Sequence, residues 1–271
     1  MKNKLGIYEK AMPENLTLKE KLQLAEKAGF DFMEISIDES EQKLNRLYLS
    51  KKEFKELKNS IMNENINIKT MCLSGHRKYP LGSLNKAVRE KSIEILEKAV
   101  EFASETSISI IQLAGYDVYY ENSNFDTVNY FEENLFKCVK FAAQNGIILA
   151  FETMETPFMN TIVKAMKYVK KVNSPYLQIY PDIGNITNSA DNVIFDIESG
   201  KGHIAAVHLK ETKEGIYRNM LFGEGRVDFD NCINEMKKQN VGMFLCEMWY
   251  DNRYQPLEFI KKAKNFFEDK I

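Results

Sequence analysis

Residues 147–182 read IILAFETMETPFMNTIVKAMKYVKKVNSPYLQIYPD. The stretch begins with the apolar run Ile147–Phe151, continues through an amphipathic segment over Thr161–Val172, and returns to a second apolar run at Leu177–Tyr180. Short, nearly continuous apolar runs are typical of strands buried on both faces, and the segment between them has the periodicity of a helix. The stretch therefore predicts a strand–helix–strand unit with two parallel strands.

The same alternation extends over the whole chain. Further strands are expected at Lys4–Tyr8, Phe32–Ile37, Ile68–Leu73, Ile108–Leu113, Ile204–His208 and Met243–Met248. Further helices are expected at Leu18–Ala28, Ser83–Ser104, Asp126–Gln144, Phe229–Lys238 and Pro256–Asp269. About eight such units without a glycine-rich phosphate loop favour a closed (β/α)₈ TIM barrel over an open doubly wound sheet. Because no linker or low-complexity run divides the chain, we expect residues 1–271 to form one α/β domain.

Composition argues against several classes of protein. The chain has 271 residues, of which 44% are hydrophobic and 28% charged, and its formal net charge is −2. Acidic and basic residues are mixed along the chain, so a nucleic-acid groove is not expected. The sequence has no apolar run long enough to span a bilayer and no signal-peptide pattern at its start. Its four cysteines are widely spaced. We therefore expect a cytoplasmic enzyme with reduced thiols that binds neither nucleic acid nor membrane.

Acidic or imidazole side chains stand at the ends of four consecutive expected strands. These residues are Glu152, Asp182, His208 and Glu247. In a TIM barrel all C-terminal strand ends lie on the face where active sites are found. Three carboxylates and one imidazole cannot share a small volume without a compensating cation, because like charges repel. We predict that they bind one divalent metal ion, and their oxygen-rich set without sulfur suits Mn²⁺, Mg²⁺, Co²⁺ or Zn²⁺.

Eight segments, in order and at fitting intervals, resemble one known family: Gly6–Ala11, Gly29–Ser36, Met71–Arg77, Ile111–Tyr120, Tyr180–Asn185, Val207–Lys210, Phe222–Asp228 and Glu247–Trp249. The chain resembles, nearly end to end, the L-ribulose-5-phosphate (L-xylulose-5-phosphate) 3-epimerases of the xylose-isomerase-like barrel superfamily. The resemblance implies an isomerase that interconverts these two sugar phosphates and forms a homodimer. It implies the same four metal ligands, with Glu152 and Glu247 also serving as the catalytic acid/base pair.

The two glutamates suit the chemistry that this resemblance implies. Inverting a carbon next to a ketone requires that its proton be removed from one face and returned from the other. Glu152 and Glu247 approach from different strands and could flank C3 of the sugar, while the metal stabilises a cis-enediolate. Asp182 and His208 would then act only as ligands. Which glutamate is the base in which direction is left open by the sequence.

Loop residues just past the strand ends are candidates for substrate contact. A phosphate group needs positive charge and hydrogen-bond donors, and Arg77 suits a bidentate contact. We favour a phosphate clamp from the first and third loops. Asn185 is expected to hydrogen-bond sugar hydroxyls, and Glu155 to orient a ligand. The full set of expected substrate-binding residues is Tyr8, Lys10, Ser74, His76, Arg77, Glu155, Asn185, Lys210 and Arg218.

Three other functions are compatible with a TIM barrel that binds a metal ion or a sugar. A 3-epimerase or aldose–ketose isomerase acting on non-phosphorylated sugars would use the same metal chemistry, although the basic loop residues argue mildly against it. A DNA-repair endonuclease on the same barrel would need a His-rich cluster for several zinc ions, and the chain has only three His. A catalytically inactive sugar-binding protein would be expected to lose Glu152 or Glu247, and both are present.

Overall fold

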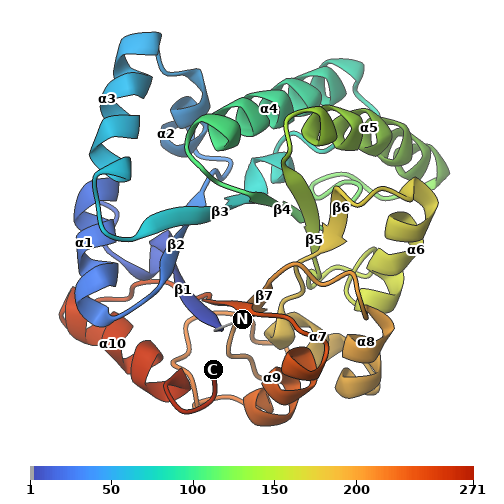
Figure 1. Ribbon diagram of the computed structural model, residues 1–271. Helices are drawn as coiled ribbons and strands as arrows, with labels where there is room; N and C mark the ends of the chain where they lie inside the picture. The colour runs from blue at the N-terminus through green and yellow to red at the C-terminus, as the bar shows by residue number, and fades with distance from the viewer. Residues whose placement is uncertain (1–2) are drawn as a thin grey trace.

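The computed structural model describes residues 3–271 and shows a barrel of parallel strands inside a ring of helices (Figure 1). Within this range the sheet has eight strands in the order β6-β5-β4-β3-β2-β1-β8-β7. The strands are β1 (Lys4–Tyr8), β2 (Phe32–Ser36), β3 (Asn67–Leu73), β4 (Ile110–Ala114), β5 (Ile148–Glu152), β6 (Leu177–Ile179), β7 (Val207–Leu209) and β8 (Met243–Cys246). The predicted (β/α)₈ barrel is confirmed.

The outer layer contains a helix after each strand. The α-helices are α1 (Leu18–Ala28), α2 (Glu41–Leu44), α3 (Lys51–Met62), α4 (Lys86–Glu105), α5 (Phe125–Gln144), α6 (Ile162–Val172), α7 (Ile183–Ser189), α8 (Val193–Ser199), α9 (Phe229–Lys238) and α10 (Pro256–Phe267). The short α8 packs against α6 and α9. Short 3₁₀ turns are η1 (Glu9–Ala11), η2 (Asn45–Tyr48) and η3 (Ser74–Arg77). Of the helices in the described chain, none combines the length and hydropathy that crossing a lipid bilayer requires.

Helix boundaries follow local capping groups. The helix expected from Ser83 begins instead at Lys86, because the Asn85 side chain accepts a hydrogen bond from the Ala87 N–H and caps the first turn. The helix at Leu18–Ala28 has the expected bounds, with Thr17 and Glu20 forming a capping box at its start. The short helices α2, α7 and α8 were not predicted, because four to seven residues are too few to show a helical period.

The barrel closes at the seam between β6 and β7. This pairing consists of isolated parallel bridges, Ile179 with Ile204 and Asp182 with His208. The His208 N–H donates to the Pro181 carbonyl at 2.9 Å. Closure of the barrel therefore sets Asp182 directly beside His208, although the two strands lie at opposite ends of the hydrogen-bonded strand order.

The interior of the barrel is apolar in one layer and polar in the next. Gly6 makes room for the Phe32 ring, since a Cβ there would lie 2.4 Å from ring atoms. The apolar layer contains Phe32, Ile110, Ala150, Tyr180, Ala206 and Leu245. Side chains two positions apart on a strand point the same way. The next layer toward the C-terminal ends therefore contains Glu34, Gln112, Glu152, Asp182, His208 and Glu247, all buried.

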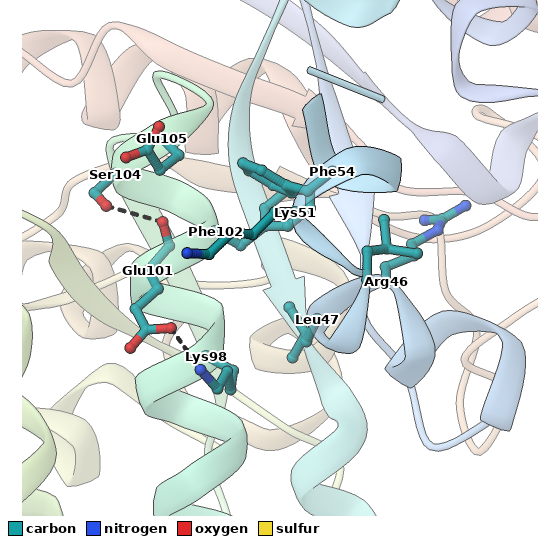
Figure 2. Close-up of a pocket in the computed structure, with 10 residues that line it drawn as sticks. Arg46, Leu47, Lys51, Phe54, Lys98, Glu101, Phe102, Ser104 and Glu105 are labelled. Carbon is teal, nitrogen blue, oxygen red and sulfur yellow. Dashed lines mark hydrogen bonds and ion pairs between the residues drawn. The ribbon is translucent and has the colours of Figure 1, made fainter. Parts of the chain in front are cut away.

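A groove on the outside of the barrel separates α3 from α4 (Figure 2). Its volume is about 480 Å³, and its walls come from the segment Arg46–Phe54 on one side and the C-terminal part of α4 on the other. The two helices touch through the edge of Phe54 against Phe102, with ring centroids 5.4 Å apart. None of the expected site residues lines this groove.

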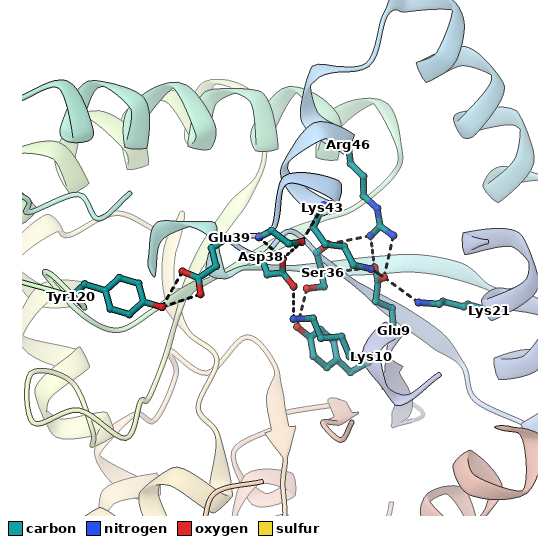
Figure 3. Close-up of polar contacts among 11 residues, drawn as sticks. Glu9, Lys10, Lys21, Ser36, Asp38, Glu39, Lys43, Arg46 and Tyr120 are labelled. Carbon is teal, nitrogen blue, oxygen red and sulfur yellow. Dashed lines mark hydrogen bonds and ion pairs between the residues drawn. The ribbon is translucent and has the colours of Figure 1, made fainter. Parts of the chain in front are cut away.

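A buried ion cluster around Glu9 joins the first two strand–helix units (Figure 3). The fully buried Glu9 carboxylate pairs with Lys43, with Lys21 at 3.4 Å and with Arg46 Nη1 at 2.5 Å. It also accepts the Ser36 N–H at 2.8 Å. Burial alone would raise the pKa of Glu9, but Arg46, Lys43 and Lys21 together lower it to about 2. The cluster thus fastens η1 to α1, β2 and α2.

Replacing this carboxylate tests its part in stability. We expect Glu9→Gln to lower the free energy of unfolding by roughly 3 kcal/mol at pH 7, because the cations lose their buried counter-ion. The folded pKa lies near 2, below the ordinary value of 4.5. The contribution is therefore fully present above pH 4.5 and is lost as the pH falls toward 2. Urea unfolding followed by circular dichroism should show the gap between wild type and variant narrowing below about pH 4.5.

The exposed pair Lys98–Glu101 provides the control for this experiment. Glu101→Gln should change the free energy of unfolding by less than about 1 kcal/mol, since solvent screens a surface pair. Equal stability of the Glu9→Gln variant and the wild type at pH 7 would contradict the assigned role of the cluster.

Candidate metal centre

Four side chains from consecutive strands converge at the mouth of the barrel. Glu152 is the last residue of β5, Asp182 follows β6 and caps α7, His208 lies in β7, and Glu247 comes directly after β8. One ligand atom from each lies within 4.8 Å of every other, and all four residues are buried. The structure therefore brings together the four residues that the sequence singled out.

Asp182 is oriented by the start of α7. Its Oδ1 accepts the Asn185 N–H at 3.0 Å, so the helix cap holds one oxygen and leaves Oδ2 facing the cluster. The Asp182 N–H donates to Thr153 Oγ1 at 3.0 Å. Lys210 contacts Asp182 Oδ2 and lies 3.7 Å from Glu247 Oε2. Local backbone geometry thus determines which oxygen of Asp182 is available as a ligand.

His208 is oriented by a residue that the sequence analysis did not single out. Its Nε2 lies 2.9 Å from Glu34 Oε1, and Glu34 Oε2 accepts the Thr70 hydroxyl at 2.6 Å. With Nε2 bound to a carboxylate, Nδ1 is the nitrogen that presents a lone pair to the centre. Nδ1 lies 3.2 Å from Glu247 Oε2 and 3.4 Å from Glu152 Oε1.

Gln112 is a second residue that the sequence analysis assigned no role. Its side-chain amide donates to Glu152 Oε2, which leaves Glu152 Oε1 on the side of His208. Gln112 interrupts the otherwise apolar strand Ile110–Ala114, and Glu34 interrupts the apolar run Phe32–Ile35; both strands are fully buried. A polar residue inside such a run costs free energy unless it is paired. A polar residue within an apolar run was therefore the sequence feature that could have indicated a role for both residues.

The electrostatics of the cluster favour a cation. Burial raises the pKa of Glu152 and of Asp182. Burial would also raise the pKa of Glu247, but Lys210 and His208 lower it below its usual range. Burial would lower the pKa of His208, yet Glu34 and Glu247 raise it well above its ordinary value. Without a metal, a proton on His208 and the ammonium group of Lys210 offset the acids, and a divalent ion would take the place of that proton, because a histidine ligand must be neutral.

The donor atoms fit a divalent ion. Among residues 3–271, His208 Nδ1, Asp182 Oδ2 and Glu247 Oε2 are buried without a well-formed hydrogen bond, and their polar contacts are ion pairs with one another and with Lys210. Buried polar atoms are nearly always hydrogen-bonded, so donor atoms of this kind gathered at one point suit a bound cation. One nitrogen with carboxylate oxygens suits Mn²⁺, Zn²⁺, Co²⁺ or Mg²⁺. The cluster is therefore compatible with metal binding.

A polar pocket lies over the cluster. Eight of the nine expected substrate-binding residues line it: Tyr8, Lys10, Ser74, Arg77, Glu155, Asn185, Lys210 and Arg218. Tyr217 and Trp249 also line it, although neither was among the nine. Tyr8 is held by a hydrogen bond of 3.0 Å to Ser36 Oγ and by the edge of Trp249. The Arg218 guanidinium lies 4.8 Å from the Trp249 ring centroid.

His76 is the ninth expected residue, and the structure places it elsewhere. It is buried, its Nε2 lies 3.1 Å from the Ser92 carbonyl of α4, and it does not line the pocket. Burial lowers the pKa of His76 to about 4, which favours the neutral ring. Within η3 only Ser74 and Arg77 reach the pocket. The geometry therefore gives no support to a substrate contact by His76 and indicates a packing role.

A closed parallel barrel with this cluster at its strand ends defines the class of the xylose isomerase-like TIM barrels. A family model described as "Xylose isomerase-like TIM barrel" matches residues 22–270. The chain is 43% identical over 268 residues to the L-ribulose-5-phosphate 3-epimerase UlaE of Escherichia coli (strain SMS-3-5 / SECEC), covering 98% of this chain and 94% of that relative. This chain belongs to the L-ribulose-5-phosphate 3-epimerase family of xylose isomerase-like TIM barrels, as its sequence motifs had indicated.

Solved structures share the fold at much lower sequence identity. The 3-keto-D-glucoside 4-epimerase YcjR of E. coli superposes with a TM-score of 0.80 at 19% identity, covering 99% of this chain and 100% of that one. A crystal structure of the IOLI protein with a binding zinc atom gives a TM-score of 0.80 at 19% identity, covering 98% of this chain and 97% of that chain. At this level of identity the likeness supports the fold alone.

Proposed function

We propose that this protein is a metal-dependent 3-epimerase that interconverts L-xylulose 5-phosphate and L-ribulose 5-phosphate. The observation that carries the proposal is the buried cluster of Glu152, Asp182, His208 and Glu247 at the mouth of the barrel. The 43% identity to an L-ribulose-5-phosphate 3-epimerase, over nearly the whole chain, supports the choice of substrate.

In this proposal the four residues hold one divalent ion, of the kind Mn²⁺, Zn²⁺, Co²⁺ or Mg²⁺. When bound, such an ion supplies Lewis-acid stabilisation of negative charge on the ketone oxygen of the sugar. Asp182 and His208 act only as ligands. Glu34 fixes the orientation of His208 through the hydrogen bond to Nε2.

Glu152 and Glu247 are proposed to move the proton. They line the pocket from β5 and β8, two strands that β6 and β7 separate in the barrel. One carboxylate removes the proton from C3, and the electron pair of that C–H bond moves toward the carbonyl oxygen to give the cis-enediolate. The other glutamate, protonated, returns a proton to the opposite face of C3, which inverts the configuration. Gln112 holds Glu152 in place through its side-chain amide.

The pocket offers partners for both ends of a sugar phosphate. Asn185 Nδ2 donates to the Thr153 carbonyl at 2.7 Å, which leaves its buried Oδ1 free to accept a sugar hydroxyl. Lys10 already pairs with Asp38 at 2.5 Å, so its charge is largely neutralised. Arg77 makes no ion pair in the described chain, and its buried Nε has no hydrogen-bond partner. We therefore propose that Arg77 is the main phosphate ligand, with Ser74 and Lys10 beside it.

Removal of the metal tests the basis of the proposal. We expect EDTA treatment and dialysis to abolish epimerase activity, and Mn²⁺, Co²⁺ or Zn²⁺ to restore it, because three buried acids need the cation. Isothermal titration of the stripped protein with Mn²⁺ should show one site. Glu34→Gln should weaken this binding by about 10- to 100-fold, since His208 loses its orienting carboxylate.

Glu198→Gln, which changes an exposed glutamate of α8, is the matched control and should bind Mn²⁺ like the wild type. Full activity of the stripped protein would rule out the metal mechanism.

Hydrogen exchange at C3 tests the acid/base assignment. In D₂O the wild type should incorporate deuterium at C3 of the substrate, as observed by proton NMR. Glu152→Gln should lose this exchange by about 10²-fold or more, because a neutral amide cannot accept the proton. Titration with Mn²⁺ should show that the variant still binds the metal through its remaining ligands. Continued deuterium uptake by Glu152→Gln would remove Glu152 from the pair.

A comparison of substrates tests the phosphate contact. L-Ribulose 5-phosphate should have a much higher kcat/KM than free L-ribulose, because binding energy from a remote group is used in the transition state. Arg77→Gln should lower kcat/KM for the phosphorylated sugar by about 10- to 100-fold, the value of a charge-assisted hydrogen bond. It should leave the value for the free sugar nearly unchanged.

The exposed neighbour Lys78 does not line the pocket, so Lys78→Gln is the control for Arg77 and should behave like the wild type. Equal kcat/KM of the wild type for both sugars would favour the alternative, an epimerase of non-phosphorylated sugars.

A further inference from the structure

One wall of the pocket is an irregular loop between β7 and α9. It presents Tyr217 and Arg218 to the pocket, and Arg218 lies over Trp249. Between residues 213 and 221 the described chain contains no α-helix and only a single bridge, Lys213 with Ile216. Left-handed backbone at Gly215, Asn219 and Gly223 turns the chain sharply. Side chains that contact the substrate from such a loop need an anchor at its base.

Glu211 supplies this anchor. Its side chain is buried, and its Oε1 accepts the Thr212 N–H at 3.1 Å and the Val227 N–H at 3.2 Å. Its Oε2 accepts the Gly223 N–H at 2.8 Å. A single carboxylate thus ties the first residue of the loop to two residues at its end. The Arg226 N–H also donates to the Thr212 carbonyl at 3.0 Å. We call the paired ends of the loop, Glu211–Thr212 and residues 223–227, its stem.

The stem is shaped around this carboxylate. A Cβ at position 225 would lie 2.0 Å from Glu211 Oε1 and 2.5 Å from the Thr212 carbonyl oxygen, so only glycine fits at Gly225. Glu211 makes no ion pair within residues 3–271, and it does not line the pocket. A buried carboxylate without a cation is stable only while hydrogen-bond donors surround it. Its donors are the amides of the closed loop, so its burial and the order of the loop depend on each other.

We propose that Glu211 is a positioning residue that closes the stem of the β7–α9 loop and thereby presents Tyr217 and Arg218 to the substrate. The closed stem follows from the contacts of Glu211 and does not depend on the proposed activity. The effect on turnover rests on the proposed epimerase function. Within the described chain, Glu211 makes no hydrogen bond to the four candidate ligands and does not line the pocket.

Limited proteolysis of the full-length protein measures the order of the loop directly. Trypsin can cut after Lys213 and after Arg218, and mass spectrometry resolves the two cuts from cleavage elsewhere. Glu211→Ala should raise the initial rate of both cuts by about tenfold or more, because loss of the three amide contacts favours the open loop. Glu211→Gln should give an intermediate rate, since its side-chain NH₂ cannot accept a hydrogen bond.

Two further variants test whether the change in cleavage comes from the stem of the loop. Gly225→Ala reaches the same stem from the opposite side and should also raise cleavage after Arg218. Glu214→Gln, at an exposed glutamate of the same loop, should cleave like the wild type. Cleavage after Lys137 of α5 serves as an internal reference, because global unfolding would raise all cuts together, whereas local opening raises only those in the loop.

Kinetics and metal titration complete the test. In Glu211→Gln, the KM for the sugar phosphate should rise several-fold more than kcat falls, while the affinity for Mn²⁺ stays within about twofold of the wild type. Unchanged cleavage after Arg218 in both Glu211→Ala and Gly225→Ala would overturn the inference, as would a rise matched by cleavage after Lys137. A wild type without epimerase activity would refute the proposed function and leave the proteolysis result standing.

Discussion

The candidate site depends on the seam where the barrel closes. Seven of the eight strand contacts are parallel ladders, of which only β2 with β3 shows a register shift within the described chain. In contrast, β6 meets β7 only through isolated bridges, one of which joins Asp182 to His208. Two of the four candidate ligands are therefore partners across the contact that completes the barrel. If this seam opened, Asp182 and His208 would separate, and the carboxylates of Glu152 and Glu247 would lose their common centre. The four side chains therefore come together only when the barrel is closed.

The polar layer above the apolar layer of the barrel costs free energy to bury, and hydrogen bonds orient most of its side chains. Glu34 binds His208 and is itself bound by Thr70, while Gln112 binds Glu152. These contacts decide which atom of each ligand faces the centre. The atoms that face the centre, one imidazole nitrogen and carboxylate oxygens, have the composition of a site for a divalent metal ion. In the proposed function, a bound divalent cation would offset the repulsion between the acids.

Buried glutamates serve three different purposes in this chain, and their partners distinguish them. Glu9 is surrounded by Lys21, Lys43 and Arg46, so it acts as a counter-ion that joins two strand–helix units. Glu211 is surrounded by backbone amides of one loop, so it shapes that loop. Glu152 faces another carboxylate and an imidazole, which is the pattern of a ligand. The burial of these three glutamates does not distinguish their roles, whereas their partners do.

The barrel and the four strand-end residues could be predicted from the sequence, because hydrophobic periodicity and the identity of the residue at a strand end are local properties. The sequence also placed most of the pocket, since loops after parallel strands must lie on one face. Only the tertiary structure revealed the roles of Glu34 and Gln112, because Glu34 meets a partner 174 residues away and no local pattern records such a pairing. The structure likewise decided that His76 points into α4 while Arg77 reaches the pocket. Side-chain direction within a short 3₁₀ turn depends on what packs around it, and that packing exists only once the barrel has closed.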